Sequence, residues 1–208
     1  MRAAEAVILY DAKVWAEALR HEKYRKRIVA VQRRSTLRIA CSYRTVFEPV
    51  VPVVAVVIPI DLQAKESQFV QQQKAVLGKE EASRIARSTS IEAGKSRWEQ
   101  KPRGRWTARL ISRIDNWINR EEREVDFYLT QFWTGHGLFL SYLAKMRKVA
   151  EGNCPYGDST NDDDHHTFFR SSRYSIERQA LEQDLGDISP DNVVEKMLRV
   201  QEEWKKVA

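Results

Sequence analysis

Residues 104–171, GRWTARLISRIDNWINREEREVDFYLTQFWTGHGLFLSYLAKMRKVAEGNCPYGDSTNDDDHHTFFRS, decide the fold because they hold the densest aromatic content of the chain. Apolar side chains recur there with the 3.6-residue period of an amphipathic helix. One group comprises Trp106, Ile114, Trp117 and Ile118, and the next comprises Phe127, Leu129, Phe132 and Trp133. We therefore expect a platform of helices whose apolar faces pack into one core.

The end of this stretch has a spacing that is typical of a metal-binding loop. Cys154 and Gly157 are three positions apart, His166 follows after eight intervening residues, and Ser171 after four more. With cysteine at positions 157 and 171, the pattern would be Cys-x2-Cys-x8-His-x4-Cys, which can hold zinc tetrahedrally. Glycine offers no ligand and a serine hydroxyl is a poor one. We therefore expect Cys154 and His166 to be vestigial ligands with weak zinc binding at most, no other cofactor, and restored zinc binding when both missing cysteines are added.

Two other histidine-containing motifs favour structural roles. His136 lies between two glycines at an expected helix end, which is typical of a packing or capping residue. The acidic run 162–164 precedes His165 and His166, but consecutive side chains cannot all point at one ion. These acids are therefore expected to cap the N-terminus of a short helix.

Composition limits the class of protein. The chain has 208 residues with 42% apolar content, enough for a real core, and a formal net charge of +6 that favours an acidic partner such as nucleic acid. An ordinary basic surface is the alternative. Two cysteines make no disulfide framework and no signal peptide opens the chain, so a nuclear or cytoplasmic location is expected. The most apolar run, residues 50–60, is too short to span a bilayer, so no membrane association is expected.

Two basic segments are candidates for nucleic-acid contact. Residues 20–44 carry nine cationic side chains against one acid, and residues 94–113 form a second basic patch with tryptophans interleaved. The expected phosphate-binding residues are Arg25, Lys26, Arg33, Arg34, Arg103, Arg105 and Arg109, and Trp98 is expected to stack on a base. The alternative for the first segment is a solvated helix face. Trp106 is expected to lie in the core.

Periodicity also predicts helices outside the platform. Residues 3–20 place Val7, Tyr10, Val14 and Leu19 near one helical face. A long solvated helix is expected after Pro59, with a break near Gly78. Two C-terminal helices are expected on either side of a break at 186–190, the second continuing through Trp204.

Three stretches resemble the C-terminal portion of the reverse-transcriptase polyprotein of insect non-LTR (type-1) retrotransposable elements. They are VVAVVIPIDLQAKE (53–66), GRWTARLISRIDNWINREEREVDFYLTQFWTGHGLFLSYLAKM (104–146) and CPYGDSTNDDDHHTFFRSSRY (154–174), with TQFWTGHG and VIPIDL as the most specific runs. The resemblance implies a polymerase palm upstream and a helical region here, including a helix from about Pro49. It also implies a zinc knuckle in which Cys154 and His166 match ligand positions and Gly157 and Ser171 depart from them.

These observations predict an all-α protein. We expect a basic helical region like a thumb or linker at 1–103, an aromatic helical platform at 104–150, a degenerate Cys/His knuckle at 151–174 and C-terminal helices at 175–208. The expected function is binding of RNA template or target DNA without polymerase activity, since the aromatic-x-Asp-Asp motif of a palm does not occur in the sequence. An intact retrotransposon polyprotein is a further expected partner. The alternative is a helical protein-interaction module or an inert relic of a transposable element.

Overall fold

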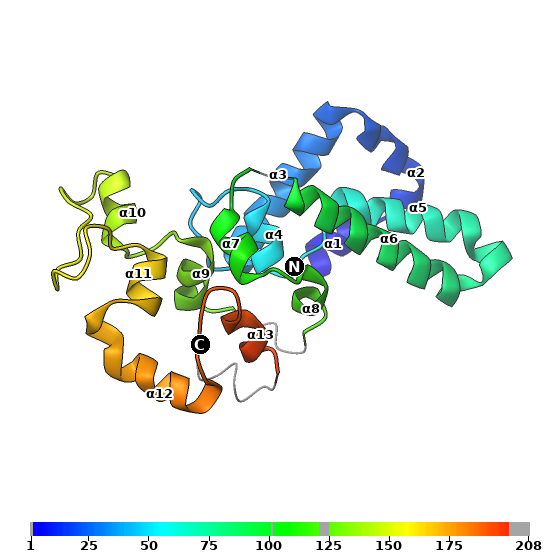
Figure 1. Ribbon diagram of the computed structural model, residues 1–208. Coiled ribbons are helices and arrows are strands. Elements are labelled where there is room, and N and C mark those ends of the chain that lie inside the picture. The colour runs from blue at the N-terminus through cyan, green and yellow to red at the C-terminus, as the bar shows by residue number, and fades with distance from the viewer. Residues whose placement is uncertain (1, 101, 121–124, 200–208) are drawn as a thin grey trace.

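The computed structural model describes residues 2–100, 102–120 and 125–199, and within these ranges the protein is all-α, as predicted, with no β-strand. Figure 1 shows a long helical hairpin at one end of the molecule and, at the other end, the loop of residues 146–163, which projects beyond the two helices that flank it. The helices are α1 (Arg2–Leu9), α2 (Ala12–Trp15), η1 (Ala16–Arg20), α3 (Glu22–Ile39), α4 (Val50–Val54), α5 (Ile60–Leu77), α6 (Lys79–Glu99), α7 (Arg105–Leu110), α8 (Ile114–Ile118), α9 (Phe127–Thr134), α10 (Leu140–Lys145), α11 (Asp164–Phe169), η2 (Ser172–Tyr174), α12 (Ser175–Leu185) and α13 (Val193–Met197).

The first predicted helix, over 3–20, is wrong as a continuous element. Asp11 adopts the left-handed conformation at φ +50° and separates α1 from α2, and the segment then continues as η1. The break resets the helical period, so Val7, Tyr10 and Val14 are more than 70% exposed and do not form the predicted apolar face. Of that face, Leu19 is buried. It packs in a small cluster with Ala12, Ala16 and Ala64.

The hairpin of α5 and α6 is the longest feature of the fold. Gly78 separates the two helices at φ +79°, which confirms the predicted break, because glycine alone takes this conformation without strain. The two helices run side by side in Figure 1. On α6 the small side chains of Ala82, Ala86 and Ser90 are buried, and the Ser90 hydroxyl donates to the Leu62 carbonyl of α5 at 3.5 Å. The prediction of a solvated helix is therefore only partly correct, because α5 and α6 bury part of their surface.

A buried glutamine joins the basic helix α3 to the start of this hairpin. Gln32 is 5% exposed, and its Nε2 donates to the Ile58 carbonyl at 2.8 Å while its Oε1 accepts from the Ile60 backbone N–H at 2.8 Å. Both backbone groups lie where α4 has ended and α5 begins, a region that lacks helical partners. The side chain of α3 therefore completes the hydrogen bonding of the hairpin's first turn.

The main core gathers around α9. Trp117 and Trp133 are both fully buried and meet edge to face, with ring centroids 4.7 Å apart. Ile114, Leu129 and Phe132 are also buried, as the platform pattern predicted. Other core residues come from α4, α6 and α13, so the segments before and after the platform share one core with it.

Hydrogen bonds fix α9 against its neighbours. Thr130 Oγ1 donates to the Ala40 carbonyl at 2.5 Å, which ties α9 to the end of α3. From α7, the Thr107 hydroxyl donates to the Trp133 carbonyl at 2.7 Å, and Trp106 Nε1 donates to the Phe132 carbonyl at 2.7 Å. Trp106 thus packs against the core, as expected. Polar as well as apolar contacts therefore hold α9 against α3 and α7.

The C-terminal helices follow the predicted break. Gly186 ends α12 at φ +71°, and α13 then buries Val193, Val194 and Met197 against the core. The predicted continuation through Trp204 lies outside the described residues. Across the described ranges, no helix combines the length and the apolar character that a bilayer span requires.

Candidate functional site

One face of α3 and the loop that follows it form a basic groove. Its volume is about 1080 Å³, and six cationic residues line it against one acid, Glu48. The cationic lining residues are Arg25, Lys26, Arg33, Arg34, Arg38 and Arg44. From Arg25 to Arg38 the helix rises about 20 Å, roughly six base steps of 3.4 Å along one nucleic-acid strand. The structure thus brings together the four residues of this segment that the sequence assigned to phosphate binding.

The four residues differ in how free their charges are. Arg25 and Arg34 are exposed and form no ion pair within the part of the chain that the structure describes. Lys26 pairs with Glu22, with Nζ and Oε1 2.9 Å apart. Arg33 is partly buried, and its Nη2 donates to the carbonyls of Arg44 and Val46 at 3.0 and 2.9 Å. Arg33 therefore holds the loop that carries Arg44 into the groove, while Arg25 and Arg34 keep their donors free.

The second predicted basic patch does not form a single site. Arg103 lies over the Phe47 ring, with its Cζ 6.0 Å from the ring centroid, and it does not line the groove. Arg105 is exposed on α7. Arg109 is held by Asp191 through two hydrogen bonds of 2.8 and 2.6 Å, which lower the pKa of that carboxyl. A phosphate would have to displace this carboxylate to reach Arg109.

The prediction that Trp98 stacks on a base is wrong. Trp98 is 6% exposed and belongs to the main core. The turn at Gly104 closes over it: a Cβ built on Gly104 would lie 3.1 Å from the Trp98 ring and 2.7 Å from Val50 Cγ2. Gly104 has φ +78°, so glycine serves here both for its conformation and for its small size. The ring cannot meet a base without unpacking this corner.

The Cys/His loop between α10 and α11 is folded by its own backbone hydrogen bonds. The Gly157 N–H donates to the Cys154 carbonyl at 3.1 Å, and the Cys154 N–H donates to the Ser159 carbonyl at 3.0 Å. The Asp162 N–H donates to the Gly152 carbonyl at 2.8 Å, which closes the base of the loop. The loop therefore turns sharply at 154–157, so that residues on both sides of the turn approach α11.

Three potential metal ligands meet at this turn. One ligand atom from each of Cys154, Asp158 and His166 lies within 4.8 Å of the other two. Cys154 and His166 are buried, and Asp158 closes the group from the solvent side. The structure thus brings together the two predicted ligands, and it adds a carboxylate that the sequence interpretation missed. The sequence did contain a sign of this third ligand: Asp158 directly follows Gly157, the position where the zinc-ligand pattern lacks a cysteine.

The other two positions of the predicted pattern differ in their surroundings. Gly157 has φ +78°, and a Cβ built on it would meet nothing within 4 Å. Ser171 is 2% exposed, and its hydroxyl accepts the Arg173 N–H at 3.3 Å. A side chain at 157 would therefore meet no neighbour but would strain the backbone at this positive φ, whereas Ser171 already has a structural partner.

The acidic run before α11 acts as a helix cap, as predicted. Asp163 is the N-cap residue, and its Oδ1 accepts the His166 N–H at 2.8 Å. His136 follows Gly135, which ends α9 in the left-handed conformation at φ +64°, and its ring stacks on Tyr142 at 4.9 Å. Burial, with Lys145 nearby, lowers the pKa of His136. The predicted capping and packing roles are confirmed.

Asp164, which directly follows the capping residue, has a strongly raised pKa. Burial, together with the Asp163 carboxylate, raises the pKa of Asp164 from its ordinary 3.8 to about 7. A carboxyl with a raised native pKa stabilises the fold fully below its unfolded pKa, near 4, and this stabilisation is lost as the pH rises through 7.

We therefore expect Asp164→Asn to be more stable than the wild type by about 1 to 2 kcal/mol at pH 8, with no advantage near pH 4. Urea denaturation at several pH values measures this difference. Asp187→Asn, at an exposed carboxyl, is the control and should show no such pH dependence. Equal stability of Asp164→Asn and the wild type at pH 8 would contradict the raised pKa.

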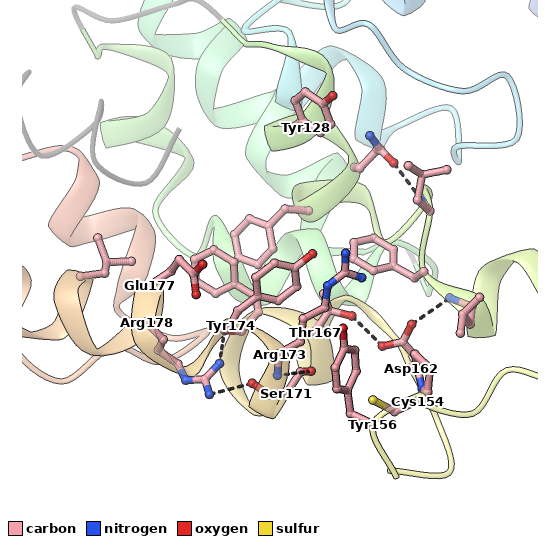
Figure 2. Close-up of a pocket in the computed structure, with 18 of the residues that line it drawn as sticks. Tyr128, Cys154, Tyr156, Asp162, Thr167, Ser171, Arg173, Tyr174, Glu177 and Arg178 are labelled. Atoms are coloured by element: carbon pink, nitrogen blue, oxygen red, sulfur yellow. Dashed lines mark hydrogen bonds between the residues drawn. The ribbon is translucent and has the colours of Figure 1, made fainter. Parts of the chain in front are cut away.

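An apolar pocket of about 610 Å³ lies beside the loop. Figure 2 shows it between α9 and α12, with Tyr128 at one side, Tyr174 and Arg178 at another, and Cys154 at its edge. Arg178 is held by the carbonyls of Phe168 and Ser171, at 3.2 and 2.9 Å, so it braces the wall. The aromatic residues of the predicted platform thus also line a cavity.

The chain was compared with protein-family models, with curated proteins and with solved structures, and none of the three comparisons yields a match.

Proposed function

We propose that this chain binds RNA or DNA through the basic groove of α3, as the C-terminal part of a reverse transcriptase of a non-LTR retrotransposable element. The observation that carries the nucleic-acid proposal is the gathering of six cationic residues around one groove with a single acid. Contacts to phosphates are strong, independent of base sequence and dependent on salt. The retrotransposon assignment rests on the resemblance of the sequence alone.

Within this proposal, Arg25 and Arg34 are the principal phosphate ligands. Both guanidiniums are exposed and unpaired in the described part of the chain, and they are nine residues apart on one helix. Each such side chain can hold a phosphate through two parallel hydrogen bonds. Arg33 contributes mainly by holding the loop of Arg44. The chain would position template or target, and it would leave polymerisation to a palm domain elsewhere in the polyprotein.

The test is binding of the purified chain to labelled single-stranded RNA and duplex DNA over a range of salt concentrations. We expect Arg25→Ala combined with Arg34→Ala to weaken binding roughly tenfold or more at low salt, and to reduce the salt slope by about 1 for each arginine. The loss should be similar for unrelated base sequences. Arg33 is left unchanged, because its removal would also disturb the loop.

The matched control is Lys74→Ala combined with Lys79→Ala, which removes the same charge from the exposed tip of the α5–α6 hairpin, far from the groove in Figure 1. This control should bind almost as the wild type does. If the two double variants lose affinity for nucleic acid equally, binding depends only on the net charge of the protein and the groove is not the binding site. If the wild type does not bind at low salt, a protein-interaction module or an inert relic becomes the better account.

A further inference from the structure

The group formed by Cys154, Asp158 and His166 has the dimensions of a metal site. Zinc binds sulfur at about 2.3 Å and nitrogen or oxygen at about 2.0–2.2 Å, so tetrahedral ligand atoms lie roughly 3.4–3.6 Å apart. Here His166 Nε2 and Asp158 Oδ1 are 3.1 Å apart, and all three ligand atoms lie within 4.8 Å of one another. Shifts of a few tenths of an ångström to about 1 Å would bring them to coordination distance.

The orientation of His166 points to a ligand and not to a simple ion pair. Its side chain is nine-tenths buried, and Nε2 has no hydrogen bond of acceptable geometry although Asp158 Oδ1 is close. The ring nitrogen is therefore not aimed along the line to that oxygen. A ring nitrogen that contacts an oxygen without being directed at it fits two ligands that face a common third point.

The Asp158 carboxylate is held in place for such a role. Its Oδ2 accepts the Ser172 N–H at 2.7 Å, and its Oδ1 lies 3.1 Å from His166 Nε2. An outer hydrogen bond of this kind orients a ligand before the metal arrives.

We propose that Cys154, Asp158 and His166 bind one zinc ion, with Asp158 in the place of the thiolate that residue 157 lacks and with water in the fourth position. The thiol of Cys154 releases its proton to solvent on binding. One thiolate and one carboxylate then balance the two charges of zinc, while the imidazole stays neutral. Ser171 stays outside this set because its hydroxyl already accepts the Arg173 N–H. The site is independent of the α3 groove.

Cobalt(II) is the probe for this site, because a thiolate ligand gives it a charge-transfer band and four-coordinate geometry gives it intense visible bands. The full chain, reduced and metal-free, should bind one equivalent of cobalt with both signals, and zinc should displace it. Cys154→Ser should abolish the charge-transfer band. Cys41→Ser, at the exposed second cysteine, should leave the band unchanged.

Asp158→Asn distinguishes a site with three protein ligands from a vestigial site in which Cys154 and His166 alone bind the metal. We expect it to weaken cobalt binding by about 100-fold or more, since even partners outside the coordination shell cost roughly 10–100-fold. Glu151→Gln, at an exposed carboxyl of the same loop, should bind as the wild type does. Adding Gly157→Cys to the Asp158→Asn chain should restore tight binding, because it returns an anionic ligand to the same turn, and a loop that had merely unfolded would not recover.

Three results would overturn the proposal. The first is wild-type affinity in Asp158→Asn. The second is a charge-transfer band that persists in Cys154→Ser, and the third is a wild-type chain that takes up no stoichiometric cobalt while its helical circular dichroism is intact. None of these results bears on nucleic-acid binding, which is measured separately at the α3 groove.

Discussion

Trp133→Ala is expected to lower the free energy of unfolding by about 3 to 5 kcal/mol, as is typical when a large aromatic side chain is removed from a core. Trp133 is fully buried, and its ring meets Trp117 edge to face at 4.7 Å. Alanine would remove this contact and leave a cavity in the main core, where α9 packs against α8. In thermal denaturation the midpoint should fall by roughly 10 °C.

The control for this variant lies on the same helix. Tyr128 is 71% exposed, so Tyr128→Ala removes an aromatic ring from α9 without opening a cavity. We expect its unfolding free energy to stay within about 0.5 kcal/mol of the wild type. If the two variants proved equally stable, α9 would not be the centre of the core.

Gln32→Ala is expected to cost about 2 to 3 kcal/mol of unfolding free energy, a large effect for a polar side chain. The Ile58 carbonyl would keep a partner, because Gln63 Nε2 also donates to it at 2.8 Å. The penalty therefore falls on the Ile60 N–H, which would be buried without an acceptor, and on the lost packing of Gln32 itself. Urea denaturation measures the difference.

The same substitution at an exposed glutamine of α5, Gln72→Ala, controls for helix propensity and should change stability by a few tenths of a kcal/mol at most. Gln32→Ala should also weaken nucleic-acid binding, if the α3 groove is the site, because it loosens the helix that carries Arg25 and Arg34. A Gln32→Ala chain as stable as Gln72→Ala would show that water satisfies the Ile60 N–H.

The core of the platform could be predicted because its signal is local. Trp117, Leu129 and Trp133 fall on the 3.6-residue period, and no partner far away in the chain is needed to recognise it. The break at Gly78 and the cap at Asp163 were predictable for the same reason, since a single residue type supplies the conformation or the hydrogen bond.

Burial that depends on distant partners could not be predicted in this way. Trp98 lies in a basic, polar segment, and its burial depends on the turn at Gly104 and on Val50. The burial of Gln32 likewise depends on backbone groups 26 and 28 positions further along the chain. Asp11 broke a helix whose composition favoured continuity. For Trp98 and Gln32 the pattern identified the helix but not the residues that would cover its faces, and for Asp11 the composition gave no sign of the left-handed conformation.

The candidate site shows the same division. The cationic face of α3 was evident from residue type and spacing. The structural role of Arg33 was not, because its guanidinium donates to the carbonyls of Arg44 and Val46 in the loop that follows the helix. The Cys-x2-Cys-x8-His-x4-Cys spacing does not include Asp158, because this residue lies one position beyond Gly157. In space, the turn at 154–157 brings this neighbour to the cluster.

The hydrogen bonds within the Cys/His loop have a consequence for how such a site can evolve. The turn is closed by backbone contacts of Cys154, Gly157 and Asp162, and the carboxylate is anchored by a backbone N–H, so the loop keeps its shape without an ion. A lineage can then exchange a cysteine for another residue in one step and still produce a folded chain. Selection on metal affinity and selection on folding are separable here, and ligands can be lost, replaced or regained one at a time.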